Sequence, residues 1–107
     1  MIVVECRLIP KRYCVNLFGM VWSRDTSWIG PRVLRHERIH TAQMREMLYL
    51  PFYIFYLLEY LVKLLIYRDH DRAYRSISFE REAYANESSC HYLSRRHPYA
   101  WISYISD

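Results

Sequence analysis

The sequence predicts a single, mainly helical α+β domain over residues 1–107, in which a short N-terminal β-hairpin precedes three helices. Hydrophobic residues make up 52% of the chain and there are only two glycines, which is typical of a chain that packs around a core. Apolar residues alternate loosely before residue 25 and recur at helical spacing after residue 31. A chain of this length is enough for one hydrophobic core and leaves little room for a second unit.

The β-hairpin is expected within residues 1–25. Residues 2–9 and 13–23 are rich in Val, Ile, Tyr and Phe, and Pro10 and Lys11 separate them. The two segments are therefore expected to pair as strands. The N-terminus has an acidic residue within its apolar run and no basic segment ahead of it, so it does not have the pattern of a cleaved signal peptide.

The charges and the cysteines exclude some classes of function. Fifteen Lys and Arg residues against eleven Asp and Glu residues give a formal charge of +4. The basic residues are scattered, without a helix-turn-helix, RNP-like or zinc-finger pattern, so we expect no nucleic-acid partner. Cys6, Cys14 and Cys90 are odd in number and lack CxxC spacing, which argues against a disulfide framework. A reducing compartment fits best, and we expect a cytoplasmic protein, with membrane association left open.

The pattern His-Glu-x-x-His at residues 36–40 is the strongest functional signal. It lies in a helix expected over residues 31–49. His36 and His40 are one turn apart, about 40° around the helix, so both rings can reach one metal ion. A single histidine on an apolar face is usually a hydrogen-bonded core residue, but two at this spacing with Glu37 beside them favour a metal site.

Residues 48–67 are nearly all apolar, and a helix is expected over residues 51–67. The length matches one crossing of a bilayer, but Pro51, Glu59 and Lys63 make insertion about neutral in free energy. Two interpretations remain open: a helix that is buried or lies at an interface, and a helix that spans the membrane. In both, the segment is a possible contact with a membrane or its surface.

Tyrosines follow one stripe of this apolar helix. Helical projection places them on the same side as Lys63, with Glu59 at the edge, while Leu, Ile and Phe occupy the rest of the circumference. The stripe comprises Tyr49, Tyr53, Tyr56, Tyr60 and Tyr67. We expect this side of the helix to be the one that meets water.

A catalytic zinc site needs a third protein ligand besides the two histidines, with a fourth position open to water. A glutamate on a second helix would supply it, and a helix is expected over residues 72–93, with Glu80 and Glu82 in it. The two carboxylates point about 200° apart around that helix, so only one of them can face the metal. Residues 94–107 form an aromatic tail broken by Pro98, for which the sequence indicates no role beyond covering the core.

Residues 79–84, FEREAY, resemble the glutamate segment of the gluzincins, the HExxH-plus-Glu metallopeptidases that include membrane-embedded prenyl-protein proteases. Residues 36–86 are similar to a group of small, largely uncharacterised bacterial zincin-like proteins with HExxHxxQ, a Tyr-rich segment and FExEAY; this stretch covers roughly half of the chain. The resemblance implies a minimal zincin-like domain in which Glu80 is the third ligand, with Glu82 as the runner-up. Tyr84 occupies a position where the larger proteases usually have Asp.

The function implied is a zinc-dependent metallopeptidase that hydrolyses a peptide or protein substrate. His36, His40 and Glu80 would hold one Zn²⁺, and Glu37 would act as the general base on water. By analogy with zincins, the strand expected near residues 16–23 would bind an extended substrate along its edge.

Two alternatives belong to other classes of protein. One is a zinc-binding protein without catalytic activity, and the other is a membrane-associated interaction protein in which the motif is a remnant. Zinc is the expected metal by frequency, since Mn²⁺, Co²⁺ and Ni²⁺ accept similar nitrogen and oxygen ligands. The sequence does not indicate the oligomeric state.

Overall fold

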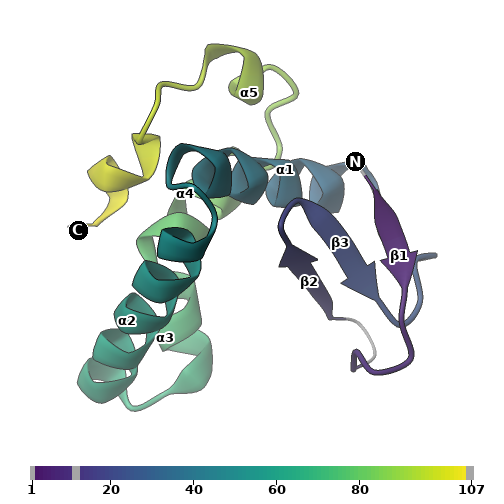
Figure 1. Ribbon diagram of the computed structural model, residues 1–107. Coiled ribbons are helices and arrows are strands. Elements are labelled where there is room, and N and C mark those ends of the chain that lie inside the picture. Colours follow the sequence, from purple (N-terminus) through teal and green to yellow (C-terminus); the bar gives the residue numbers. More distant parts are fainter. Residues whose placement is uncertain (1, 11–12, 106–107) are drawn as a thin grey trace.

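A small β-sheet lies beside a group of helices, and the first long helix passes along both (Figure 1). The computed structural model describes residues 2–10 and 13–105 of the chain. Strands come first and helices follow, which confirms the predicted mainly helical α+β fold.

The sheet is built from β1 (Val3–Glu5), β2 (Cys14–Leu17) and β3 (Met20–Ser23), with β3 in the centre. β3 pairs with β2 in antiparallel and with β1 in parallel orientation. β2 therefore lies at an edge of the sheet, and only one of its two sides is paired within the described residues.

A tight turn connects β2 to β3. Phe18 and Gly19 form it, and both have positive φ angles, of 54° and 91°, as a two-residue hairpin turn requires. The hairpin expected between residues 2–9 and 13–23 is therefore wrong in its pairing. The hairpin lies inside the second segment, because the turn falls at its glycine, while the first segment joins the far side of β3 in parallel. Lys11, expected in the connection between the two strands, lies outside the described residues.

Within the described residues, five α-helices and one 3-10 helix follow the sheet. They are α1 (Pro31–Glu46), α2 (Leu50–Tyr67), α3 (His70–Ser76), α4 (Ser78–Asn86), α5 (Tyr92–Arg95) and the 3-10 helix η1 (Ala100–Tyr104). Leu48 and Tyr49 have positive φ angles, of 60° and 67°, which separate α1 from α2 and redirect the chain. For this reason α1 is shorter than the expected 31–49, while α2 agrees with the expected 51–67 to within one residue.

The helix expected over residues 72–93 is divided in the structure. Ile77 has extended backbone angles and separates α3 from α4. The carboxylate of Glu59 in α2 accepts hydrogen bonds from the backbone N–H and the hydroxyl of Ser78, the first residue of α4. This side chain caps α4 from a distance and fixes where the helix begins. α4 ends at Asn86, so the last part of the expected helix is instead a turn followed by α5.

The hydrophobic core lies where α1, α2 and α4 meet. Met44, Phe52, Ile77 and Phe79 form its buried cluster. Trp101 in η1 packs on Phe79, with 4.6 Å between the ring centroids. The aromatic tail therefore covers the core from the side of α4, and through this packing it helps to position the helix that carries the glutamates.

The tyrosines near and along α2 face the protein and not the water. Those packed against the buried cluster are Tyr49, Tyr53, Tyr56 and Tyr60. The hydroxyl of Tyr53 donates to the backbone oxygen of Asn16 at 3.0 Å, which ties α2 to β2. The expectation that the tyrosine side meets water is therefore wrong. A phenol can bury its ring and still bond a polar partner, so polarity alone does not indicate which side of this helix is exposed.

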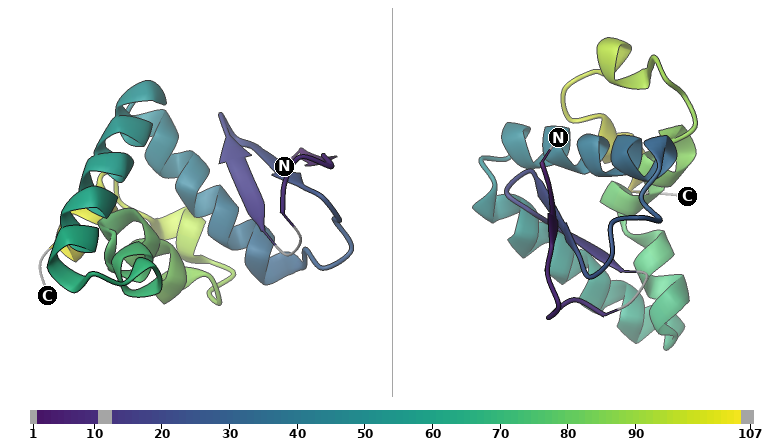
Figure 2. Two further views of the ribbon diagram at one scale, coloured as in Figure 1. Left: turned by 90° about the horizontal axis from the view of Figure 1, so that it is seen from below. Right: turned by 90° about the vertical axis from the view of Figure 1, so that its right-hand side faces the viewer.

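α2 lies on the outside of the molecule, on the side away from the sheet (Figure 2). Its 18 residues have a mean hydropathy of 1.5, and Phe52 is the single fully buried residue among them. By length and composition this helix could cross a membrane. A helix in the core of a protein would be mostly buried, and this one is not.

Candidate metal centre

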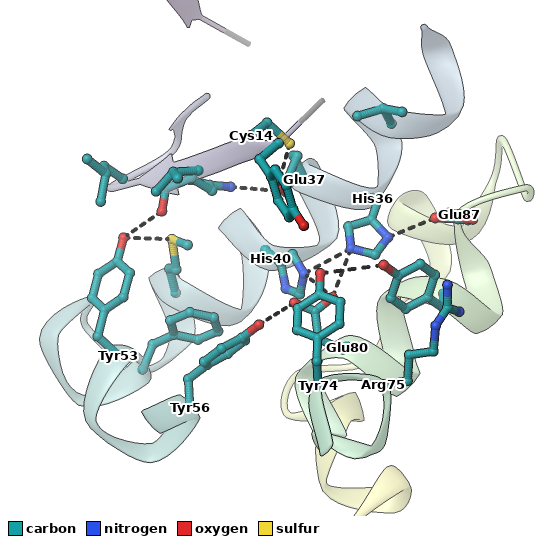
Figure 3. A pocket seen from close by; sticks show the side chains of 18 of the residues that line it. Cys14, His36, Glu37, His40, Tyr53, Tyr56, Tyr74, Arg75, Glu80 and Glu87 are labelled. Carbon is teal, nitrogen blue, oxygen red and sulfur yellow. Dashed lines mark hydrogen bonds and ion pairs between the residues drawn. The ribbon is translucent and has the colours of Figure 1, made fainter. Parts of the chain in front are cut away.

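α1 places the three motif residues on its buried face. The exposed fractions are 8% for His36, 6% for Glu37 and 4% for His40. All three border a cavity of about 880 Å³ between β2, α1, α2 and the α3–α4 pair (Figure 3). The prediction that the histidines face inward is therefore confirmed.

Three donor atoms from α1 and α4 converge at one point of this cavity. Nε2 of His36 lies 3.0 Å from Oε1 of Glu80, and Nε2 of His40 lies 3.1 Å from the same oxygen. The two Nε2 atoms are 3.1 Å apart. The ligand atoms of a tetrahedral zinc site, each about 2.0–2.1 Å from the metal, lie roughly 3.3–3.4 Å from one another. The donor set therefore fits a small divalent cation after a shift of a few tenths of an ångström.

The charges of this cluster stabilise one another. Burial alone would raise the pKa of Glu80, but the charges and hydrogen bonds of His40 and His36 outweigh it and hold the pKa well below its usual range. Burial alone would lower the pKa of His40, but the Glu80 carboxylate opposes it and raises that pKa to about 9. Opposite charges are thus held together out of water. Metal binding would replace the proton that His40 shares in this cluster with a cation.

Glu87 holds His36 from behind. Its Oε2 atom lies 2.8 Å from Nδ1 of His36, which turns Nε2 toward Glu80 (Figure 3). The sequence analysis gave Glu87 no role. Its position seven residues after Glu80, two helical turns along the same face, was the signal that could have found it.

His40 is oriented by a chain of polar side chains. Its Nδ1 atom lies 2.8 Å from Oε1 of Gln43, and Nε2 of Gln43 donates to Oε1 of Glu82 at 3.0 Å. Nε and Nη2 of Arg96 donate to Glu82 at 2.6 and 3.1 Å, and the hydroxyl of Tyr92 adds a bond of 2.7 Å. Glu82, the predicted alternative ligand, thus bonds Gln43, Tyr92 and Arg96 and not the histidines. Through Gln43 it helps to orient His40.

Arg96 also joins this polar chain to the end of α1. Its Nη1 and Nη2 atoms donate to Glu46 at 3.2 and 2.8 Å, and the side chain is 6% exposed. The backbone N–H of Tyr99 donates to the same carboxylate at 2.7 Å. The guanidinium therefore bridges two acidic residues on different helices, a contact that fixes α1 and α4 relative to each other.

Glu37 points into the cavity with one oxygen free. Oε2 of Glu37 is buried, and no described side chain or backbone group bonds to it. Its Oε1 atom lies 3.8 Å from the sulfur of Cys14 in β2. Burial raises the pKa of Glu37, although the charges of His40 and His36 oppose the rise. A buried carboxylate with an unsatisfied oxygen is suited to hold a water molecule and accept its proton.

Three tyrosines lie at the donor cluster, and one of them bonds the carboxylate of Glu80. The hydroxyl of Tyr56 donates to Oε2 of Glu80 at 2.5 Å, which leaves Oε1 for the histidines. Tyr84 packs its ring on His36, with 4.5 Å between the centroids, and its hydroxyl lies 3.4 Å from that of Tyr74. Tyr84 therefore contacts His36 through its ring. The carboxylate that bonds His36 belongs to Glu87, about one turn further along.

In comparisons with known proteins, no family model, no curated protein and no solved structure matches the chain. These comparisons therefore do not assign the chain to a family, and the function of the site is inferred from its residues. The structure brings His36, Glu37, His40 and Glu80 together at one cavity, as a group that could bind a metal ion.

Proposed function

We propose that this chain is a zinc-dependent metallopeptidase in which His36, His40 and Glu80 hold one Zn²⁺ and Glu37 is the general base. The observation that carries the proposal is the convergence of three donor atoms, 3.0–3.1 Å from one another, beside a buried carboxylate. Ordinary core histidines satisfy separate partners. Here both Nε2 atoms point at one oxygen, and both Nδ1 atoms have partners of their own.

The chemistry follows from the positions of these side chains. Zinc supplies Lewis acidity, which brings the pKa of water near 7 and polarises a carbonyl group. Glu37 takes the proton of the attacking water on its free oxygen and passes it to the leaving amine. Because burial raises its pKa, this carboxylate is a stronger base than one on the surface.

Hydroxyl groups at the same cavity can stabilise the oxyanion that forms when water attacks. Tyr74 and Tyr84 both border the cavity. Burial and the nearby charge of Glu80 raise the pKa of Tyr74 well above its usual range, so this phenol remains a hydrogen-bond donor. Either hydroxyl could serve as the donor that peptide hydrolysis requires for the oxyanion.

An extended peptide would bind along β2. Residues 13–17 border the cavity, and within the described residues no strand pairs with the outer edge of β2, although the Asn16 carbonyl there already accepts from Tyr53. The sequence analysis expected the peptide to bind near residues 16–23, a range that includes β3. Because β3 is paired on both sides, β2 is the strand of this range with an edge for a peptide. The side-chain amide of Asn16 donates to the backbone oxygen of Glu37 at 3.0 Å, so the edge strand and the general base are held in register.

A direct test is cleavage of a peptide library by zinc-loaded protein, followed by mass spectrometry, with Glu37→Gln as the matched control. We expect wild type to cleave and Glu37→Gln to bind one zinc but to lose hydrolysis by a factor of about 10² or more. If Glu37→Gln kept its turnover, the mechanism would be excluded. If the wild type held zinc and cleaved nothing, the chain would be a metal-binding protein without peptidase activity.

A further inference from the structure

The outward face of α2 is a continuous apolar surface. Its residues are between 44% and 78% exposed, Leu61 at the low end and Leu65 at the high end. They are Leu50, Ile54, Phe55, Leu57, Leu58, Leu61, Val62, Leu65 and Ile66, which we call the α2 outer face. Single exposed leucines are ordinary, but a contiguous patch of this extent on one helix usually marks a contact with another phase or another molecule.

The charged residues of α2 do not interrupt the α2 outer face. Glu59 turns inward, and its carboxylate caps α4 through Ser78. Lys63 lies one turn further along the same side and is half-buried. The free energy of insertion estimated from the sequence was about neutral because it counted these two charges. Both charges lie outside the α2 outer face, so burial of that face in lipid does not require their desolvation.

The packing of α3 against α2 argues against α2 as a membrane-spanning helix. α3 turns back from the end of α2 and packs along it, as both figures of the fold show. Asp71, Arg72 and Arg75 of α3 are exposed, and the guanidinium of Arg72 lies over the ring of Tyr67 in α2. A span through the bilayer would carry these charges into the hydrocarbon, whereas a helix lying in the interface keeps them among headgroups and water.

A protein partner fits the α2 outer face less well than lipid does. Protein interfaces are rich in Tyr, Trp and Arg and carry about one hydrogen bond per 100–200 Å². The α2 outer face consists of Leu, Ile, Val and Phe, and no side chain in it can form a hydrogen bond. Acyl chains require nothing more than apolar surface, and the exposed Arg68, the residue that follows α2, can reach lipid phosphates.

We propose that α2 lies in the plane of a membrane surface, with the α2 outer face among the acyl chains. The 18 residues of α2 form a rod of about 27 Å, long enough to anchor a small domain. The net charge of +4 is modest, so binding depends mainly on apolar burial and rises only slightly with anionic lipid. This contact does not depend on the metal centre, because its residues lie on the opposite side of the helix from the cavity.

The test is flotation of metal-free protein with phosphatidylcholine–phosphatidylglycerol vesicles, in the presence of a chelator. The variant carries Leu58→Glu and Leu65→Glu, two exposed positions two turns apart on one stripe. The matched control is Leu8→Glu, which is 90% exposed and lies on the sheet side of the molecule. We expect wild type and Leu8→Glu to float equally, and the double variant to bind at least about tenfold more weakly.

Thermal unfolding followed by circular dichroism checks that the double variant is folded. We expect it to fold, because Leu58 and Leu65 are both exposed. Wild type that stays unbound at all lipid concentrations would overturn the proposal. So would a wild-type dimer, by analytical ultracentrifugation, that the double variant abolishes while neither protein floats, since the face would then be covered by a second copy. Retention in cell membranes after an alkaline carbonate wash would show a span, whereas release agrees with a helix at the surface.

Discussion

Glu87 lies one residue beyond the end of α4, and its Oε2 atom is 2.8 Å from Nδ1 of His36. An ionised carboxylate only accepts hydrogen bonds, so Nδ1 is the donor, and Nε2 is the atom left for a metal. Oε1 of Glu87 reaches Arg32 at 3.8 Å, and that side chain is 69% exposed. The orientation of a histidine in α1 therefore depends on a carboxylate that lies 51 residues further along the chain.

Loss of this carboxylate should weaken metal binding and leave the ligands in place. For Glu87→Ala we expect zinc affinity to fall by about 10–100-fold, because the imidazole is no longer held in one orientation. Competition with a chromophoric chelator measures the affinity. Arg32→Gln is the control: it removes only the exposed partner of Glu87 and should change the affinity little. Equal affinities in Glu87→Ala and wild type would assign Glu87 to stability alone.

The two glutamates of α4 should differ in what their removal does. Glu80→Gln should bind no zinc at equimolar concentration, because a ligand atom is lost. Glu82→Gln should retain one zinc per folded chain but lose roughly 3 kcal/mol of stability, since the buried Arg96 loses a charged partner. Elemental mass spectrometry gives the metal content and urea denaturation the free energy of unfolding. Metal loss in Glu82→Gln with full retention in Glu80→Gln would reverse the assignment.

The stability of the metal-free protein should fall between neutral and alkaline pH. The pKa of His40 rises from 6.5 in the unfolded chain to about 9 in the folded one, so its contribution is complete below 6.5 and is lost as the pH rises through 9. The loss amounts to about 3 kcal/mol. Urea denaturation in chelator at pH 6 and pH 9 measures it. His40→Gln should lack this part of the slope, and an unchanged slope in that variant would contradict the prediction.

The Cys14 thiol should be unusually slow to react. Burial, together with the charge of Glu37, raises its pKa to about 12. At pH 8 this lowers the thiolate fraction by about a thousandfold relative to a pKa of 9. In metal-free protein, alkylation by iodoacetamide, followed by mass spectrometry, should therefore modify the exposed Cys90 long before Cys14. Glu37→Gln removes one of the charges and should speed up Cys14 several-fold; equal rates for the two cysteines would contradict the geometry.

Helix positions could be predicted because periodicity is a local property of the sequence. α1 and α2 each carry enough turns for the apolar spacing to be read, and the inward face of α1 followed from that spacing. The pairing of β1 could not be predicted. A strand of three residues carries too little alternation to fix its partner, and its place beside β3 depends on tertiary packing.

Within the candidate site, the residues with a fixed spacing were found and the single polar residues were not. His36 and His40 follow from the i, i+4 spacing. The need for a third ligand indicated Glu80 or Glu82, and the resemblance of residues 79–84 to the gluzincin segment favoured Glu80. Arg96 belongs to no repeated pattern, and Glu87, although two turns from Glu80, lies just beyond the end of α4. Only the folded chain brings these two residues to the imidazole of His36 and to the carboxylate of Glu82. The sequence analysis also expected the wrong side of α2 to be exposed. Its tyrosines pack against residues from other parts of the chain, which the pattern of α2 alone does not indicate.

The bridge made by Arg96 has a consequence for the order of events during synthesis. His36, His40 and Glu80 all leave the ribosome before Arg96 does, so the three donors exist before the group that steadies Glu82 and, through Gln43, His40. A nascent chain that has emerged only as far as α4 lacks the link between Glu46 and Glu82. The centre is therefore completed late. A growing chain thus holds the three donor atoms before it holds the contact that fixes α1 against α4.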